Sequence, residues 1–211
     1  QGVAPKGWNS DSCLIGSFIM QKTCSYSGGC LEPAWDKSLS GLCLFHDQGN
    51  GGDDESAALV WQTARARCVS AHAVFSGWHF PKDEEGFKGL AFAGTAVFDG
   101  AVFDGAVRFL GTVFKDFVRF DGATFNGNAR FWHGIFEKNA SFANVTFRGE
   151  AEFGGAGFSG SALFNNAGFR QLAGFGAGPD GSFLASWLYA GTNVSDAPVV
   201  HLCSEGVQLI V

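Results

Sequence analysis

Three cysteines and one histidine lie near the start of the chain in a spacing that is suited to binding a metal ion. The four residues are Cys24, Cys30, Cys43 and His46. Three thiolates and an imidazole form a complete tetrahedral ligand set for Zn²⁺, and the final Cys-x-x-His pair is short enough for both side chains to reach one ion. The first gap is longer than usual for such a site, and Gly28 and Gly29 can provide the turn that it needs.

Two chemistries are open for this cluster: a structural zinc site, or disulfides and unligated core cysteines. Four protein ligands leave no position for water or substrate, so zinc bound here would stabilise structure and would not catalyse. The other cysteines, Cys13, Cys68 and Cys203, have no assigned partner, and an oxidised partner for Cys13 stays open. The Cys/His combination slightly favours the cytoplasm, and no other feature identifies the compartment.

The rest of the sequence contains no constellation that indicates catalysis. We find no nucleophile motif, no Walker loop and no dinucleotide fingerprint that follows a strand and opens a helix. No stretch reaches the roughly 18 to 20 apolar residues of a membrane span. We therefore predict a protein that is not an enzyme, takes no small-molecule substrate and does not span a membrane.

Phenylalanine recurs through the second half of the chain and indicates the elements that surround the cluster. From Phe92 to Phe175 the steps alternate between six and five residues, so the unit is eleven residues with two Phe. The residue two before each Phe is nearly always small, and Gly, Asn or Asp dominates two positions after it. Such steps fit neither a helix nor a continuous strand. They fit a strand-like triplet, with the small residue and the Phe both inward, followed by a tight corner.

Successive triplets joined by corners predict an all-β solenoid whose coils stack through backbone hydrogen bonds. Four sides would give 22 residues per coil and between four and five coils over residues 73–175, whereas a flattened, two-sided solenoid would have eleven residues per coil. Stacking of the Phe side chains in the core explains them without an aromatic cofactor site or a base-stacking platform.

Several repeat units resemble the pentapeptide-repeat family in its Phe-rich, eleven-residue variety. They include AVFDG at 96 and at 101, ATFNG at 123, ASFAN at 140 and AEFGG at 151. The resemblance covers about residues 73–175 and implies a right-handed quadrilateral β-helix, which is why we prefer four sides. Proteins of this variety often carry, before the solenoid, a small Cys-rich element that ends in a segment like LCLFHD at 42–47, followed by a short helix. The resemblance therefore also implies a zinc-binding-like element at Cys24, Cys30, Cys43 and His46.

Four segments are predicted from these patterns. An N-terminal segment with the Cys/His element comes first, then a capping helix, then the solenoid and a C-terminal cap. Their ranges are 1–50, 51–72, 73–175 and 176–211. The helix has acidic residues at its start, capped by Asp53 or Asp54, and interleaved apolar residues, so we expect it to cover the open edge of the first coil.

A period of 22 residues also predicts which side chains point outward. Ala91, Val113, Ile135 and Gly157 would form an apolar stripe, and the neighbouring face would carry Arg108, Arg130 and Glu152 beside Leu110 and Trp132. An apolar stripe on an outer wall favours a covered surface. The predicted partner-binding residues are Val113, Ile135, Leu110, Trp132, Arg108 and Arg130. The occupant is a protein partner, a second copy or the chain's own C-terminal segment.

These patterns predict a noncatalytic scaffold that presents solenoid faces to a protein partner. One alternative is an accessory subunit of a larger complex, including a membrane-associated one. A second, drawn from the resemblance, is a DNA mimic directed at topoisomerase. Between Phe87 and Phe175 there are seven acidic and eight basic residues, and this balance does not imitate duplex DNA. No nucleic-acid partner is predicted.

Overall fold

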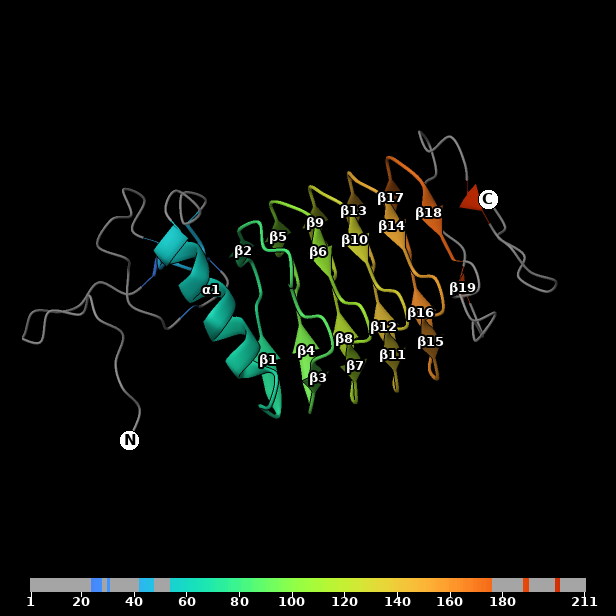
Figure 1. The fold of residues 1–211 in the computed structure, drawn as a ribbon, viewed down its shortest axis with the longest axis horizontal. Coiled ribbons are helices and arrows are strands. Elements are labelled where there is room, and N and C mark those ends of the chain that lie inside the picture. Colours follow the sequence, from blue (N-terminus) through green and yellow to red (C-terminus); the bar gives the residue numbers. More distant parts are fainter. Residues whose placement is uncertain are drawn as a thin grey trace, which may run out of the picture.

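The computed structural model describes residues 24–27, 30, 42–47, 54–175, 188–189 and 200–201. Most of them form a stack of short parallel strands, and the helix α1 (Asp54–Arg67) lies across the N-terminal end of that stack (Figure 1). Within the described residues, no helix has both the length and the hydropathy of a membrane span.

The strands form four parallel sheets, each named here as a wall after its first strand. The β1 wall contains β1 (His72–Val74), β4 (Thr95–Val97), β8 (Val118–Arg119), β12 (Ala140–Ser141), β16 (Ala162–Leu163) and β19 (Leu188–Tyr189). The β2 wall contains β2 (His79–Phe80), β5 (Val102–Phe103), β9 (Thr124–Phe125), β13 (Thr146–Phe147) and β17 (Gly168–Phe169). The β3 wall contains β3 (Ala91–Phe92), β7 (Val113–Phe114), β11 (Ile135–Phe136) and β15 (Gly157–Phe158). The β6 wall contains β6 (Val107–Arg108), β10 (Ala129–Arg130), β14 (Ala151–Glu152), β18 (Ala173–Gly174) and β20 (Val200–His201).

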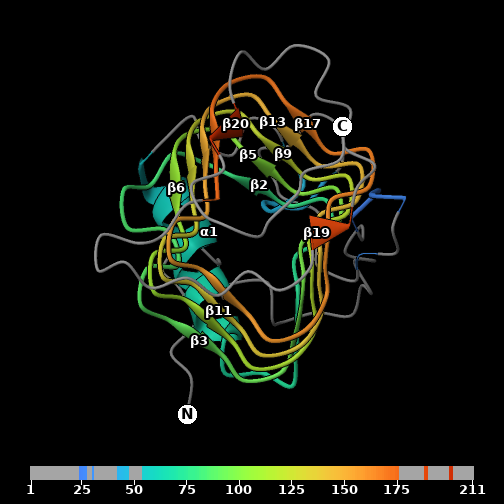
Figure 2. The same cartoon turned by 90° about the vertical axis from the view of Figure 1, so that its right-hand side faces the viewer.

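The register of these walls sets the number of residues in one coil. Val113 pairs with Ile135, and Ile135 pairs with Gly157, so residues 22 apart lie side by side. Seen along the stack, the coils have a four-sided outline (Figure 2). The predicted quadrilateral solenoid is therefore confirmed, and the two-sided alternative with eleven residues per coil is wrong. The right-handed sense stays a prediction.

The solenoid core is a set of stacked phenylalanine rings. All the Phe of the repeat, from Phe75 to Phe175, are buried. From Phe87 to Phe153, each ring of the repeat lies nearly parallel to the ring 22 residues later: Phe98 and Phe120 have centroids 4.7 Å apart, and Phe120 and Phe142 are 5.0 Å apart. Rings from the opposite β1 and β6 walls meet edge to face, so both favoured aromatic geometries occur in the core. Phe117 lies outside the rhythm, and its side chain is 48% exposed.

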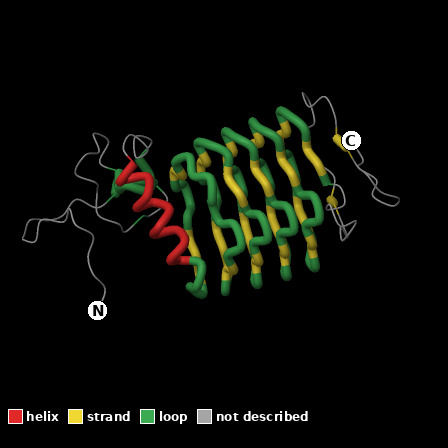
Figure 3. Tube along the Cα trace, viewed as in Figure 1, coloured by secondary structure: helices red, strands yellow, loops and turns green. Residues whose placement is uncertain are grey.

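Tight corners separate the short strands, which appear as isolated segments in each coil (Figure 3). One corner repeats Gly100, Gly122, Asn144 and Asn166, each in the left-handed region with φ between 55° and 68°. Glycine adopts this conformation without a Cβ penalty, and Asn is the residue that tolerates it next best. The predicted preference for Gly and Asn after each Phe thus has its expected cause.

The first coil is covered by α1, as the sequence predicts, although the helix is shorter than the predicted segment 51–72. Val60, Trp61 and Ala64 are buried against the coil, and the Trp61 indole N–H donates to the Pro81 carbonyl at 2.8 Å. Arg65 donates to the Asp83 carboxylate at 2.6 Å. At the other end, β19 and β20 each add one strand to a wall, and the rest of the predicted C-terminal cap lies outside the described residues.

Candidate metal centre

The Cys/His element, defined here as the described residues 24–27, 30 and 42–47, contacts the first coil of the solenoid. The backbone N–H of His79 in β2 donates to the Phe45 carbonyl at 2.7 Å. The Phe45 ring stacks on Trp78 with centroids 4.1 Å apart. The Arg67 guanidinium lies over the same indole at 4.7 Å, so this element, α1 and the first coil meet around Trp78.

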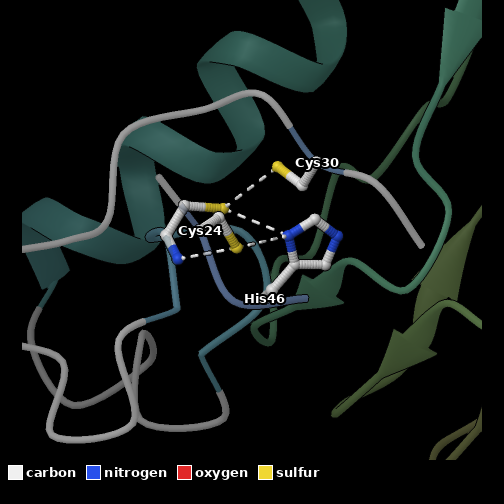
Figure 4. A group of neighbouring side chains, drawn as sticks. Cys24, Cys30 and His46 are labelled. Carbon is white, nitrogen blue, oxygen red and sulfur yellow. Dashed lines mark hydrogen bonds between the residues drawn. The ribbon is translucent and has the colours of Figure 1, made fainter. Parts of the chain in front are cut away.

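The four predicted ligands come together in this element. Their ligand atoms all lie within 4.8 Å of one another. The Cys43 Sγ lies 3.1 Å and the Cys24 Sγ 3.5 Å from His46 Nδ1, and the Cys30 and Cys43 sulfurs are 3.8 Å apart. Figure 4 shows the labelled side chains pointing toward one another. A tetrahedron with Zn–S bonds of about 2.3 Å and a Zn–N bond of about 2.0 Å has edges of about 3.5 to 3.8 Å. The four residues thus lie close enough to bind one metal ion.

The structure excludes a disulfide among the described cysteines, so a metal site and unligated thiols are the two chemistries that remain. Cys24, Cys30, Cys43 and Cys68 are all free thiols. A disulfide requires sulfurs about 2.05 Å apart, far shorter than the 3.8 Å between Cys30 and Cys43. Cys13 and Cys203 lie outside the described residues.

The solenoid orients the His46 ring so that one of its nitrogens faces the three sulfurs. His46 Nε2 lies 2.8 Å from the Ser76 carbonyl oxygen, which can only accept a hydrogen bond, so Nε2 carries the proton. Nδ1 is then left with its lone pair facing the sulfurs. This arrangement, with one ring nitrogen free and the other held by a carbonyl, is the usual second sphere of a metal-bound histidine. Tyr26 stacks on the same ring at 4.0 Å and restrains its rotation.

Burial affects the protonation of Cys43. Cys24, Cys43 and His46 are 7%, 1% and 5% exposed. Desolvation raises the pKa of the Cys43 thiol well above its ordinary range, so in the metal-free protein this thiol stays protonated. A bound divalent cation would replace such protons, because thiolates are the ligands. The Cys43 backbone N–H donates to Cys24 Sγ at 3.1 Å and holds that sulfur beside the other candidate ligands.

Cys68 is a separate thiol with a packing role. It is buried between α1 and the first coil, where its Sγ donates to the Ala64 carbonyl at 3.6 Å. Burial raises the pKa of Cys68 to about 12, which keeps the thiol neutral. The sequence predicted the four residues that come together in this element, whereas the contacts of His46 with Ser76 and Tyr26 had no signal in the sequence.

The six predicted partner-binding residues lie on two neighbouring walls and the corner between them. Arg108 and Arg130 pair in register on the β6 wall, and Arg130 also forms an ion pair with Glu152 at 3.2 Å. Val113 and Ile135 pair in register on the β3 wall, with Ile135 45% exposed. Leu110 and Trp132 follow the β6-wall strands at the corner, and Trp132 is 39% exposed. Their role in binding a partner stays a prediction.

The fold and this site define a parallel β-solenoid with a Cys₃His element on its first coil. The family model described as "Pentapeptide repeats (9 copies)" matches residues 87–135. Residues 87–135 therefore carry pentapeptide repeats, as the resemblance predicts, and the β-solenoid of this family is typically noncatalytic. A search of curated proteins and a search of solved structures each found no match.

Proposed function

We propose that this protein is a noncatalytic scaffold that binds a protein partner at the corner between the β6 and β3 walls. This apolar corner consists of Leu110, Val113, Trp132 and Ile135. The observation that carries the proposal is the exposure of Trp132 and Ile135, at 39% and 45%, on one coil beside their partly exposed neighbours of the preceding coil. Grouped exposed apolar side chains mark interaction sites, and Trp is enriched among the residues that dominate binding.

The charges around the apolar corner support a protein partner over the DNA-mimic alternative. Arg108 and Arg130 border the corner on the β6 wall. Elsewhere acidic side chains are neutralised within the solenoid: Arg119 pairs with Asp99 at 2.5 Å and with Asp121 at 3.5 Å. Interleaved charges of both signs do not imitate the uniform negative potential of a duplex. An accessory subunit of a larger complex would use the same corner and is tested by the same experiment.

The test is retention of partner proteins by immobilised variants. We expect Val113→Lys/Ile135→Lys to lose a protein that the wild type retains, because two buried lysines would be desolvated without partners. The matched control is Val102→Lys/Thr124→Lys, which places the same charges at partly exposed, in-register positions of the β2 wall. Equal retention by both double variants would refute the role of the corner.

We also propose that Cys24, Cys30, Cys43 and His46 bind one structural zinc ion. The near-tetrahedral spacing, the His46 tautomer and the burial of the ligands support this. The ion would supply only cross-linking, tying the N-terminal element to the first coil. Metal analysis of the purified chain should give one zinc per chain, lost in Cys43→Ser and kept in Cys68→Ala. Purified wild type without zinc, or Cys68→Ala without it, contradicts the assignment.

A further inference from the structure

We propose that the partner at the apolar corner is a second copy of this chain, bound face to face through the β3 wall in a two-fold dimer. The inference rests on the proposed function, because it names the occupant of the same surface. It is carried by the way apolar and charged side chains repeat from one coil to the next.

The β3 wall has an uncharged outer row. Ala91, Val113, Ile135 and Gly157 pair in register, so their outward positions form a straight line with about 4.8 Å between strands. Their neighbours in sequence, Phe92, Phe114, Phe136 and Phe158, point inward and are buried. A straight row of small and medium apolar side chains is a surface that a second flat wall can approach closely.

One symmetry operation makes this wall complementary to itself. In an isologous contact, residue i of one copy touches residue j of the other, and j touches i. A two-fold axis parallel to the strands and midway between β7 and β11 exchanges positions 22 residues apart. It sets Val113 against Ile135 of the second copy, and Leu110 against Trp132 of the second copy. Each larger side chain then faces a smaller one.

The same axis also matches the charges at the other border of the wall. Lys115 and Glu137 directly follow β7 and β11, occupy equivalent positions on successive coils, and are both exposed. The operation brings Lys115 of each copy against Glu137 of the other, which gives two symmetric ion pairs. Charge complementarity of this kind fixes register and suppresses other arrangements.

Neighbouring arrangements lack this match. Lys88 and Leu110 occupy equivalent positions of successive coils, since they are 22 residues apart and the Gly89 N–H donates to the Leu110 carbonyl. An axis midway between β3 and β7 would therefore set Lys88 of one copy against Leu110 of the other. An axis along the stack would set Lys115 against the Leu110 border of the second copy. Each of these covers a lysine with an apolar side chain, which costs free energy. The axis between β7 and β11 is therefore the favoured one.

The size of the wall sets the expected affinity. Four strands about 4.8 Å apart, crossed by the five to six residues of one side, give roughly 350 Å² per copy. The total of about 700 Å² is below that of standard-size interfaces and is typical of weak, transient contacts. We therefore expect a dimer that dissociates in the micromolar range.

The experiment is sedimentation of the zinc-loaded full chain from about 1 to 200 μM, a range chosen to bracket that affinity. The wild type should shift from monomer to dimer with concentration. Lys115→Glu should weaken the dimer at least tenfold, and Lys115→Glu/Glu137→Lys should restore it, because the exchanged charges again match. Arg170→Glu is the control, since it makes the same charge change at an exposed position that follows β17 on the β2 wall.

A wild type that is monomeric throughout overturns the inference, and so does a dimer that Lys115→Glu leaves intact or that the double variant fails to restore. The retention experiment is read separately. If a monomeric wild type still retains another protein through Val113 and Ile135, the dimer is refuted and the scaffold function stands. If the dimer forms as described and no other protein is retained, the scaffold binds itself.

Discussion

Replacing Gly77 with alanine tests whether the first coil supports the metal centre. Gly77 follows Ser76, whose carbonyl holds His46, and has a φ of 67°. A Cβ at this position would lie 2.3 Å from the Tyr26 ring, so Tyr26 must move away from His46, on which it stacks. Gly100 is the matched control, because its φ is 64° and an added Cβ meets nothing within 4 Å.

The expected magnitudes follow from these two effects. Both variants place a Cβ in the left-handed region, which costs roughly 1 to 2 kcal/mol of stability. Only Gly77→Ala also loses the ring stacking, worth about 0.5 to 1.5 kcal/mol. At about 1.4 kcal/mol per factor of ten, this corresponds to a zinc affinity about two to twelve times weaker. Gly100→Ala should leave the affinity unchanged.

The assay is competition for zinc with a chromophoric chelator, combined with urea denaturation of the metal-loaded proteins. Denaturation should show a similar backbone penalty in both variants, with any further loss in Gly77→Ala. Equal zinc affinities for Gly77→Ala and the wild type would refute the coupling between the first coil and the metal centre. Equal weakening in the two variants would show that backbone strain alone, and not Tyr26, is responsible.

Three further predictions concern the phenylalanine core, the proposed zinc ion and the partly buried carboxylate of Asp99. Phe120→Ala should cost about 3 to 5 kcal/mol in urea denaturation because its ring is fully buried, whereas Phe117→Ala, at an exposed position, should cost less than about 0.5 kcal/mol. Chelation of zinc should speed hydrogen exchange at the His79 amide, which donates to Phe45, and should leave exchange at the mid-solenoid Thr124 amide unchanged. Equal exchange rates at His79 with and without zinc would contradict the proposal that the ion ties the Cys/His element to the first coil. Burial raises the pKa of Asp99 above its ordinary value of 3.8, so the folded state binds this proton more tightly than the unfolded chain. The unfolding free energy should therefore fall as pH rises from 3.8 through the folded pKa, and Asp99→Asn should reduce that fall, as measured by urea denaturation across this pH range.

Much of the fold was predictable because the repeat is regular. A Phe with a small residue two positions earlier occupies the same environment in every coil, so each repeat independently supports the same interpretation. The four candidate metal ligands were predictable because Cys-x-x-His is a local pattern whose chemistry depends on few other residues. Phe117 shows the limit of composition alone: it shares the residue type of the core, but its position outside the rhythm places it on the surface.

Other features depend on contacts that the sequence does not encode locally. An eleven-residue unit is compatible with both two-sided and four-sided coils, and the pairing of Val113 with Ile135 decides between them, because register joins residues a full coil apart. The hydrogen bond from His46 to Ser76 spans 30 residues and uses a backbone carbonyl, which every residue possesses. The exposure of Trp132 and Ile135 likewise depends on which walls meet at their corner.

The sequence by itself determined the repeat, the inward direction of the Phe side chains and the identity of the four candidate ligands, because these depend on residue type and short spacing. Only the tertiary structure decided the 22-residue coil, the docking of the Cys/His element on the first coil and the pairing of outer side chains across the walls. The physical reason is that these features arise from contacts between segments about 20 to 30 residues apart, which exist only once the coils are stacked.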